Sequence, residues 1–311
     1  MKLLWILLGI TTLALLLALL ISYICFRLAF YSPRRRNNDD FEAVLPPGAV
    51  YAPYRDQMRQ LTTETRAMPY EAVSIQSFDG LTLLGKYYEC DPNAPMEIMF
   101  PGYRGLAERD LCGGVQRAFA VGRNVLLVDQ RACGACDGSV ITFGIYERLD
   151  CLSWIDFAIG KFGPDVKIVL SGVSMGAATV TMAAGMEQLP KNVFGVVADS
   201  GYTSPREIIC KVISDMHLPP KLCWPFVKLG ARIFGKFDIE AASSMEAVKH
   251  ARVPIFFSHG QADAFVPCDM TVRLYEACVS EKTLALIPGA GHGLCYLVQP
   301  ERYIEELKNA F

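Results

Sequence analysis

The sequence predicts an α/β fold with a mostly parallel sheet, and three observations support this prediction. Short apolar runs alternate with segments of helical periodicity from residue 71 onward, a pattern typical of a parallel sheet with helices on both faces. The run Val125–Val128 contains no polar residue, as expected of a strand buried on both faces. Asp79 and Gly80 separate two β-rich runs and indicate an antiparallel hairpin at one edge. We therefore expect eight strands in one domain, residues 71–311.

The expected elements follow one another without an internal repeat. The predicted strands are Val73–Ser77, Leu81–Tyr88, Glu97–Phe100, Asn124–Asp129, Lys167–Gly172, Phe194–Ala198, Pro254–His259 and Thr283–Ile287. The predicted helices are Asp110–Gly122, Tyr146–Phe162, Met175–Gln188, Cys268–Val279 and Gln299–Asn309. Residues 37–70 are expected to be a linker followed by a polar helix around Tyr54–Arg66, which supports the domain from outside.

The longest apolar run of the chain lies at its N-terminus. Leu3–Phe26 contains 24 residues without a charge, which corresponds to about 36 Å of helix against a hydrocarbon core of about 30 Å. A secretory signal peptide is the alternative, but its apolar region is usually about 7–15 residues long and ends in a small-x-small cleavage site. This run is longer and shows no obvious site. We expect a retained, single-pass membrane anchor with a basic flank at residues 1–36.

The charge of the chain is unevenly distributed. Residues 1–36 contain five basic residues and no acidic one: Lys2, Arg27, Arg34, Arg35 and Arg36. Because only Lys2 precedes the span and the arginines follow it, the domain is expected on the cytoplasmic side of the membrane. The remaining chain contains 25 Lys and Arg against 32 Asp and Glu. This acidic surplus excludes a general nucleic-acid binder, which needs clustered Lys and Arg for phosphate contacts.

The eleven cysteines are scattered through a domain too large to need disulfide cross-links. Cys133 and Cys136 form a CxxC pattern, for which a redox pair is one interpretation. The Asp-Gly-Ser that follows at residues 137–139 indicates a loop, whereas redox pairs of this kind normally begin a helix. We therefore favour two ordinary thiols near a loop, and unpaired cysteines agree with a cytoplasmic domain.

A glycine-flanked serine gives the first indication of chemistry. Residues 172–176 read Gly-Val-Ser-Met-Gly and match the pattern GxSxG. The motif follows an expected strand and begins an expected helix, which is the placement that a nucleophile elbow requires. Ser174 would lie on a strained turn there, and the helix N-terminus would offer the Met175 N–H to a developing oxyanion. The alternative is a glycine-rich turn that needs only space.

A serine hydroxyl is a weak nucleophile at neutral pH and needs a base, for which the chain has four histidines. His217 lies before two prolines in an expected insertion, His250 lies among basic residues at an expected helix end, and His259 ends a strand and frames a turn. His292 lies in a glycine-rich loop after the last expected strand. From that loop it can reach the end of the sheet where the elbow presents Ser174. We therefore predict His292 as the base.

The base needs an acid to orient it, and two aspartates are candidates. Asp263 lies on the loop after the penultimate strand, and Asp199 ends the strand before that one. Both satisfy the chain order Ser, Asp, His of a serine nucleophile on such a sheet. Asp263 has the richer surrounding motif and the better loop placement. We therefore prefer Asp263 as the orienting acid.

These motifs together resemble the α/β-hydrolase superfamily, and within it the branch of serine aminopeptidase-like and monoacylglycerol-lipase-like enzymes. The resemblance covers residues 70–310 and rests on GxSxG at 172–176, Asp-Gln-Arg at 129–131 with Asp-Gly-Ser at 137–139, the segment 259–267, and Gly-His-Gly at 291–293. It implies Ser174 as nucleophile, Asp263 as acid and His292 as base. It also implies that Tyr103, in the loop after the third strand, donates the second oxyanion N–H beside that of Met175.

One position in that loop departs from the family pattern. Relatives usually have His-Gly there, and Pro101 occupies the His position in this chain. That His is ordinarily structural, so the departure leaves the triad untouched but alters the expected loop. Cys133 and Cys136 likewise replace residues that are commonly polar in relatives.

Residues 201–244 are inserted between two core strands, and in this fold such an insertion is usually a short helical cap over the serine. The insertion is rich in apolar side chains: Ile208, Ile209, Val212, Ile213, Met216, Leu218, Leu222, Trp224, Phe226, Val227, Ile233 and Phe234. These side chains either pack the cap onto the domain or line an apolar pocket for an acyl chain near the membrane.

The expected function is that of a membrane-anchored serine hydrolase that cleaves a carboxylic ester, with an acyl or lipid ester as the candidate. No metal or organic cofactor is expected, because no cluster of His, Cys and Asp has convincing ligand spacing. Amide hydrolysis by a serine peptidase or aminopeptidase is an alternative, because the same triad cleaves amides. A catalytically silent scaffold that binds a partner or lipid at the membrane is the other alternative, and Pro101 is its only support in the sequence.

Overall fold

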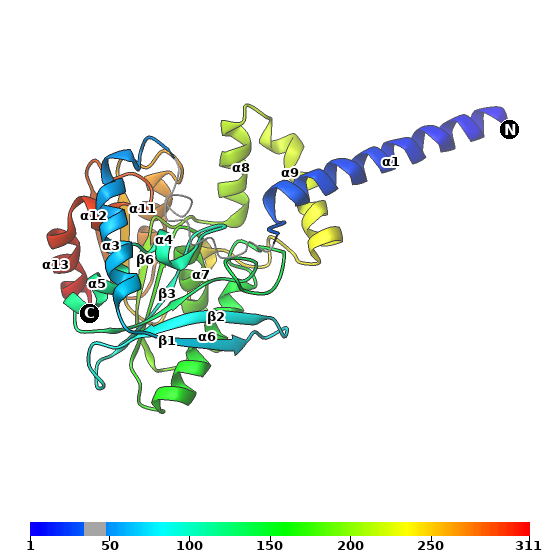
Figure 1. Ribbon diagram of the computed structural model, residues 1–311. Helices are drawn as coiled ribbons and strands as arrows, with labels where there is room; N and C mark the ends of the chain where they lie inside the picture. Colours follow the sequence, from blue (N-terminus) through cyan, green and yellow to red (C-terminus); the bar gives the residue numbers. More distant parts are fainter. Residues whose placement is uncertain (34–47) are drawn as a thin grey trace.

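The computed structural model describes residues 1–33 and 48–311 of the chain. The expected basic residues Arg34, Arg35 and Arg36, and the expected linker residues 37–47, lie outside the described residues. The described chain contains an eight-stranded sheet with the strand order β1-β2-β4-β3-β5-β6-β7-β8 (Figure 1). Its strands are β1 (Glu71–Gln76), β2 (Thr82–Tyr88), β3 (Met96–Phe100), β4 (Asn124–Val128), β5 (Ile168–Val173), β6 (Val193–Asp199), β7 (Ile255–Gly260) and β8 (Lys282–Ile287).

The sheet is parallel except at its first edge. β1 pairs antiparallel with β2 across the turn at Asp79 and Gly80, and β2 pairs antiparallel with β4. All other neighbouring strands are parallel. The predicted α/β class, the mostly parallel sheet of eight strands and the opening hairpin are therefore confirmed. Because parallel strands end at the same edge, the loops after β3, β5, β6, β7 and β8 gather there, which is where open α/β sheets place their sites.

Helices cover both faces of the sheet (Figure 1). One face carries α6 (Glu147–Phe162), α7 (Met175–Ala184), α10 (Ser244–Ala247) and α11 (Cys268–Ala277). The other carries α3 (Arg55–Ala67), α5 (Gly114–Ala120), α12 (Cys295–Val298) and α13 (Pro300–Ala310). Within β5, Ile168 and Leu170 pack with the first group of helices, whereas Val169 packs with the second. β3, β4 and β5 are buried along their whole length and are mostly apolar, because both of their faces are covered.

The helix predicted at Asp110–Gly122 is shorter in the structure, because only α5 (Gly114–Ala120) lies within it. α4 (Ala107–Asp110) ends before Gly113, and α5 begins directly after it. Gly113 has φ +77°, and a Cβ atom at this position would lie 2.7 Å from the ring of Tyr296. Gly113 separates α4 from α5, because its backbone has a left-handed conformation that only glycine adopts easily. α7 likewise ends at Ala184, earlier than the predicted Gln188.

The expected supporting helix is present as α3, which follows a short 3-10 turn, η1 (Ala52–Tyr54). Its buried residues are Met58, Thr62 and Thr65. Gln116 of α5 donates its side-chain N–H to Leu61 O at 3.0 Å. α3 is therefore fixed to the domain by one buried edge and by hydrogen bonds to α5.

The chain between β6 and β7 forms α8 (Pro205–Asp215), α9 (Pro220–Gly230) and a π-helical turn, η2 (Ala231–Gly235). These elements lie within the insertion expected at residues 201–244. Ser204 begins α8 by accepting the Glu207 N–H with its side chain at 3.1 Å, a standard N-cap. Figure 1 shows α8 and α9 standing at the end of the molecule where α1 (Lys2–Ala29) joins it. We call α8, α9 and η2 the cap.

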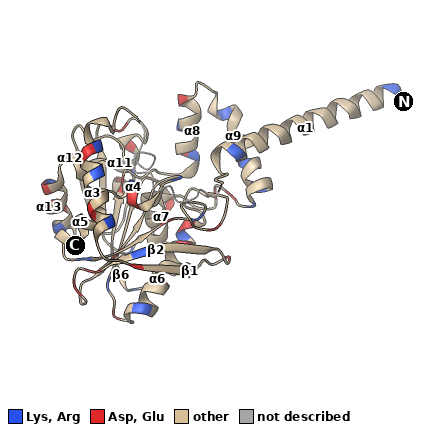
Figure 2. Ribbon diagram, in the orientation of Figure 1, with Lys and Arg blue, Asp and Glu red and all other residues tan. Residues whose placement is uncertain are grey.

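α1 is long and apolar enough to cross a membrane, judged by its length and composition. Its N-terminal part extends away from the domain, and Figure 2 shows no charged residue along this part after Lys2. The last turns differ, because Ser22 and Phe26 are buried against α9 and η2. A Cβ atom on Gly230 would lie 2.4 Å from Ser22 O. The two helices therefore approach to backbone contact, which the absence of a side chain at Gly230 permits.

The chain directly after α1 is also part of the folded domain. Ser32 N donates to Ser139 O at 2.9 Å, and Ile141 N donates to Phe30 O at 2.8 Å. Phe30 is fully buried, and its ring meets that of Phe143 edge-on with 5.8 Å between centroids. The end of α1 is therefore held by packing and by backbone hydrogen bonds on both sides.

Candidate active site

Ser174 lies on the turn between β5 and α7. Its backbone has φ 58° and ψ −116°, a conformation that residues other than glycine rarely adopt and that marks a strained turn. A Cβ atom on Gly172 would lie 2.2 Å from the backbone of Gly176, and one on Gly176 would lie 2.0 Å from Phe100 O. The two glycines of the motif are required by these close approaches. The turn presents Ser174 at the edge where the parallel strands end.

Asp263 and His292 come together from two different loops, after β7 and after β8. His292 Nδ1 lies 2.7 Å from Asp263 Oδ2, and Asp263 Oδ1 accepts the N–H groups of Phe265 and Val266 at 2.9 Å each. Burial raises the pKa of Asp263, but hydrogen bonds from His259 and His292 outweigh it and hold the pKa well below its usual range. Because an ionised carboxylate only accepts, His292 carries its proton on Nδ1 and keeps Nε2 free as a base.

His259, which was predicted only to frame a turn, also contacts the carboxylate of Asp263. The side chain is fully buried, with Nε2 at 3.1 Å from Asp263 Oδ2 and 3.0 Å from Val266 O. Its Nδ1 lies 2.6 Å from Thr271 Oγ1. Since the Val266 carbonyl can only accept, Nε2 carries a proton and donates to Asp263 as well. Asp263 therefore has two histidine donors, and the spacing of four residues between His259 and Asp263 was the available signal.

The remaining candidates lie apart from this pair. Asp199 ends β6, and its carboxylate accepts the Ser200 hydroxyl at 2.8 Å, with no hydrogen bond to His292 among the described residues. His250 is exposed and lies 3.3 Å from Glu246. His217 is exposed after the end of α8. The structure thus brings Asp263, and not Asp199, against His292.

Ser174 and His292 line one cavity of about 400 Å³, together with Tyr103 and Phe265. No hydrogen bond joins the Ser174 hydroxyl to His292 in the part of the chain that the structure describes. Such contacts are often long without substrate and tighten when it binds. The structure therefore brings the acid and the base into direct contact, and it brings the serine and the base to the wall of the same cavity. We call it the His292 cavity.

The loop after β3 carries Tyr103, whose N–H is the expected second oxyanion donor. Neither this N–H nor that of Met175 has an acceptor within residues 1–33 and 48–311. The loop is held on either side of Pro101, because Gly102 N donates to Asp110 Oδ2 at 2.9 Å and Gln130 Nε2 donates to Pro101 O at 2.6 Å. The loop is thus fixed without the usual His. Sequence reasoning missed Asp110 and Gln130 because both contacts join the loop to other segments.

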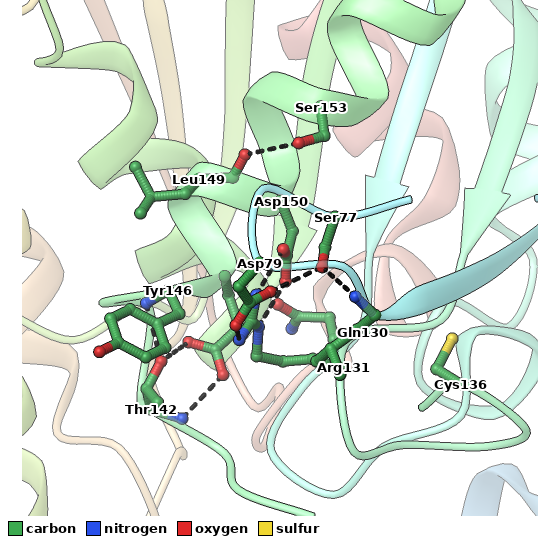
Figure 3. Close-up of polar contacts among 12 residues, drawn as sticks. Ser77, Asp79, Gln130, Arg131, Cys136, Thr142, Tyr146, Leu149, Asp150 and Ser153 are labelled. Atoms are coloured by element: carbon green, nitrogen blue, oxygen red, sulfur yellow. Dashed lines mark hydrogen bonds and ion pairs between the residues drawn. The ribbon is translucent and has the colours of Figure 1, made fainter. Parts of the chain in front are cut away.

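Arg131, the residue after Gln130, is buried at the centre of an ionic network with Asp150 and Asp79 (Figure 3). The Arg131 guanidinium binds Asp150 at 2.6 and 2.7 Å and Asp79 at 3.0 Å twice. It thereby joins the turn of the β1–β2 hairpin, the loop after β4 and the N-terminal part of α6. Bidentate pairs of this kind fix geometry as well as charge. The network holds the segment from which Gln130 reaches the loop of Tyr103.

Cys133 and Cys136 lie in turns of the loop after β4, as their context predicted. Both are buried free thiols, and all eleven cysteines of the chain are unpaired. Burial raises the pKa of the Cys136 thiol to about 12 and that of Cys133 well above its ordinary value. A thiol with a raised pKa is a poor thiolate nucleophile. The structure therefore offers no support for a redox role at this pair.

A second cavity of about 430 Å³ adjoins Ser174 on the side of the cap. It shares Tyr103, Ser174 and Phe265 with the His292 cavity. Its other walls come from three parts of the chain: the end of α1, the loop containing Phe143, and the helices α8 and α9. Nearly all of the side chains that line it are apolar. We call it the cap cavity.

Comparison with known proteins places this architecture. No model of a known protein family matches the chain. Solved structures do, among them the esterase Pf2001 of Pyrococcus furiosus, with a TM-score of 0.64 and 20% identity over 90% of this chain and 96% of that chain. Mouse alpha/beta hydrolase domain-containing protein 10 matches with a TM-score of 0.54 and 16% identity over 77% of this chain and 97% of its own. The chain has the α/β-hydrolase fold. The predicted fold is confirmed, including the hairpin edge and the α/β-hydrolase resemblance at the level of fold.

The relatives found by sequence match a smaller part of the chain. The chain is 24% identical over 184 residues to the uncharacterized protein YqkD of Bacillus subtilis, in an alignment that covers 59% of this chain and 60% of that one. It is 24% identical over 222 residues to protein bem46 of Schizosaccharomyces pombe, which covers 69% of this chain and 68% of the relative. The chain thus matches about three fifths of the length of the Bacillus relative.

Proposed function

We propose that the chain is a membrane-anchored serine hydrolase that cleaves a carboxylic ester through an acyl-enzyme on Ser174. One observation carries this proposal: the strained Ser174 elbow and His292, which Asp263 holds from behind, line one cavity, beside two N–H groups that have no acceptor in the described chain. The fold is shared with the Pyrococcus furiosus esterase and with Est1E of Butyrivibrio proteoclasticus, which was solved with ferulic acid. These neighbours support ester hydrolysis in general.

The proposed reaction needs only the two oxyanion N–H groups and the side chains of Ser174, His292 and Asp263. His292 Nε2 takes the hydroxyl proton of Ser174 as Oγ attacks the ester carbonyl, and the N–H groups of Tyr103 and Met175 bind the resulting oxyanion. When the carbon–oxygen bond breaks, His292 returns this proton to the leaving alcohol. Water then attacks the acyl-enzyme, gives a proton to His292, and releases the carboxylic acid and the Ser174 hydroxyl. Asp263 orients His292 and stabilises its charged form throughout.

The packing of α1 supports a retained anchor. Phe26 and Phe30 are 6% and 0% exposed, and they contact the cap and the loop of Phe143. Removal of α1 as a signal peptide would uncover this apolar surface, which folded domains rarely expose. Lys2 precedes the span, and Arg27 with Arg34–Arg36 follows it, which favours a domain on the cytoplasmic side. A lipid or other small ester is the proposed substrate partner.

Labelling with a fluorophosphonate probe tests this function directly. We expect full-length protein in detergent to be labelled, and Ser174→Ala to abolish the labelling. Ser214→Ala is the matched control, because Ser214 is an exposed serine of α8 outside the cavity walls. Absence of labelling in folded protein would favour the silent scaffold, and labelling that survives Ser174→Ala would refute the nucleophile.

Paired substrates separate ester from amide hydrolysis. We expect p-nitrophenyl butyrate to be cleaved and an aminoacyl p-nitroanilide to be cleaved far more slowly. The fold also occurs in an acylaminoacyl peptidase of Pyrococcus horikoshii, with a TM-score of 0.57, so the amide is a necessary comparison. Preference for the anilide would replace the esterase with a peptidase on the same triad.

A further inference from the structure

Of the two cavities that meet at Ser174, only one gives access to the proposed base, His292. His292 lines the His292 cavity and is not part of the wall of the cap cavity. The leaving alcohol must take its proton from His292, so it must lie where that imidazole is accessible. The acyl part of the same ester then extends from Ser174 in the other direction. This assignment rests on the proposed function, because it uses the proton path of an acyl transfer.

The walls of the cap cavity suit an apolar chain. Ile209, Val212 and Ile213 of α8 and Val227 of α9 form one side, and Leu28 of α1 lies on the other. Among the described side chains that line it, only Arg104 carries a charge. Its Nη2 donates to Leu28 O at 3.0 Å and to Tyr31 O at 2.7 Å, whereas its Nε is buried without a hydrogen-bond partner in the described chain. A bound apolar chain would therefore meet mainly apolar side chains, with Arg104 as the exception.

We propose that the cap cavity binds the acyl chain of a membrane lipid ester, and that the last turns of the membrane span form part of its wall. Cys25, Leu28 and Ala29 of α1 line the cavity directly. The anchor thus has a second role, because it shapes the substrate site in addition to holding the enzyme at the bilayer. The substrate class follows from the lining: an ester whose acyl group is an unbranched, uncharged hydrocarbon chain.

The position of the cavity identifies the bilayer as the source of that chain. Met216 and Leu218, between α8 and α9, line the cavity and are 56% and 47% exposed. Leu222 of α9 is 66% exposed beside them. α9 packs along α1, whose apolar surface continues outward from the domain (Figure 1). An apolar surface therefore runs from the span to the cavity, so a lipid chain can move to Ser174 with little exposure to water.

The same turns of α1 accept hydrogen bonds from the loop that contains Tyr103 and Arg104, which we call the oxyanion loop. Tyr103 Oη donates to Ala29 O at 2.8 Å, and Arg104 donates to Leu28 O and Tyr31 O as described above. Carbonyls at the end of a helix have no partner within the helix and need one elsewhere. Here the two residues that satisfy them include the expected oxyanion donor and its neighbour. Hydrogen bonds thus join the end of α1 to the oxyanion loop, and both of them line the cap cavity.

An ester chain-length series with a variant of α1 tests this proposal in the full-length protein in detergent. For the wild type, kcat/KM should rise from acetyl to octanoyl p-nitrophenyl ester by up to about fourfold per methylene. Leu28→Trp narrows the cavity, and Leu28 is 64% exposed, so the fold should tolerate the larger side chain. We expect it to lower the octanoyl-to-acetyl ratio of kcat/KM at least tenfold. Cys25→Phe, from the same wall, should lower that ratio too if Leu28→Trp does not fold.

The control and the opposing outcomes are distinct. Leu17 is an exposed residue on the part of α1 that extends away from the domain, so Leu17→Trp is the matched control. We expect it to leave the octanoyl-to-acetyl ratio of kcat/KM unchanged. An octanoyl-to-acetyl ratio that is flat in the wild type, or unaffected by both wall variants, would overturn the proposal while fluorophosphonate labelling of Ser174 still upholds the hydrolase. Loss of labelling in the wild type would instead remove the proposed function itself.

Discussion

The two cavities beside Ser174 are built on different principles. Around the His292 cavity the polar groups are fixed by directed bonds, with Asp263 accepting from two histidines and two backbone N–H groups. Around the cap cavity the walls are mostly apolar side chains, contributed by segments as far apart as Leu28 and Val227, although Tyr103 and Arg104 in this wall donate to carbonyls at the end of α1. Acyl transfer needs a few groups in exact positions, whereas an apolar chain is bound by shape and by burial.

This difference separates two kinds of effect. A substitution on the His292 side should change the rate for every ester, because every ester uses the same base and oxyanion donors. A substitution on the cap side should change the ranking among esters, because only long chains fill that cavity. The predictions below test the boundary between the two sides, from the largest expected effect to the smallest.

Asp263→Asn is expected to lower kcat about 10⁴-fold with all esters, by analogy with the same change in other serine triads. Asparagine keeps the size of the side chain but no longer fixes the proton of His292 on Nδ1. Steady-state kinetics with the acetyl and octanoyl esters measures the effect, which should be equal for both. Asp199→Asn is the control, since Asp199 bonds Ser200 and not His292. A larger loss in Asp199→Asn than in Asp263→Asn would reverse the choice of acid.

Asp110→Ala should lower kcat about 100-fold and leave KM within a few-fold. Asp110 accepts the Gly102 N–H at 2.9 Å and so holds the loop from which Tyr103 donates. Loss of one oxyanion donor typically costs about 10²–10³ in kcat. The octanoyl-to-acetyl ratio should stay constant, because the cap cavity does not include Asp110. A change confined to the octanoyl ester would show that the loop serves the acyl side as well.

His259→Leu should lower the free energy of unfolding by about 2 kcal/mol at pH 7, because it removes a charged hydrogen bond from buried Asp263. Asp263 has a lowered pKa in the folded state, so its stabilisation is present above its unfolded pKa of about 3.9 and is lost as the pH falls. The difference between variant and wild type should therefore narrow below about pH 4. Chemical unfolding at pH 7 and pH 3 measures it.

His259→Gln provides the matched comparison for that prediction. Glutamine keeps an N–H donor of similar reach, so it should recover part of the stability lost in His259→Leu. Equal losses in both variants, independent of pH, would indicate that His259 contributes packing and no hydrogen bond to Asp263.

The two sides also differ in how far the sequence predicts them. The elbow and the three triad candidates stand in short motifs with a fixed place after strands, so Ser174, Asp263 and His292 could be predicted as a triad from residues alone, and the structure places His292 against Asp263. The turn at Gly113 was missed because the ring that excludes a side chain there belongs to Tyr296, which is distant in the chain. The contact of His259 with Asp263 was missed because the same residue also satisfies a simpler description as a strand end.

The cap side was predicted only in composition. The apolar residues of 201–244 indicated packing or a pocket, and nothing in their spacing distinguishes the two. Ile208 and Val227 do both, since each packs within the cap and lines the cavity. That Leu28 and Ala29 of α1 join them depends on the close approach of α1 to α9, which Gly230 permits. Long-range contacts of this kind leave no periodic pattern in the sequence.

Arg104 lies where the two sides join, and its substitution should give the smallest effect. Arg104→Gln removes the donors to Leu28 O and Tyr31 O but leaves the loop held by Asp110 and Gln130. One hydrogen bond contributes about 1 kcal/mol net, so kcat for the acetyl ester should fall about fivefold with KM little changed. Arg104→Lys keeps one cationic donor and should recover part of that loss. A fall in thermal stability with unchanged kcat would mean that Arg104 only fastens α1 to the domain, whereas a fall in kcat that Arg104→Lys reverses would show that α1 positions the loop of Tyr103.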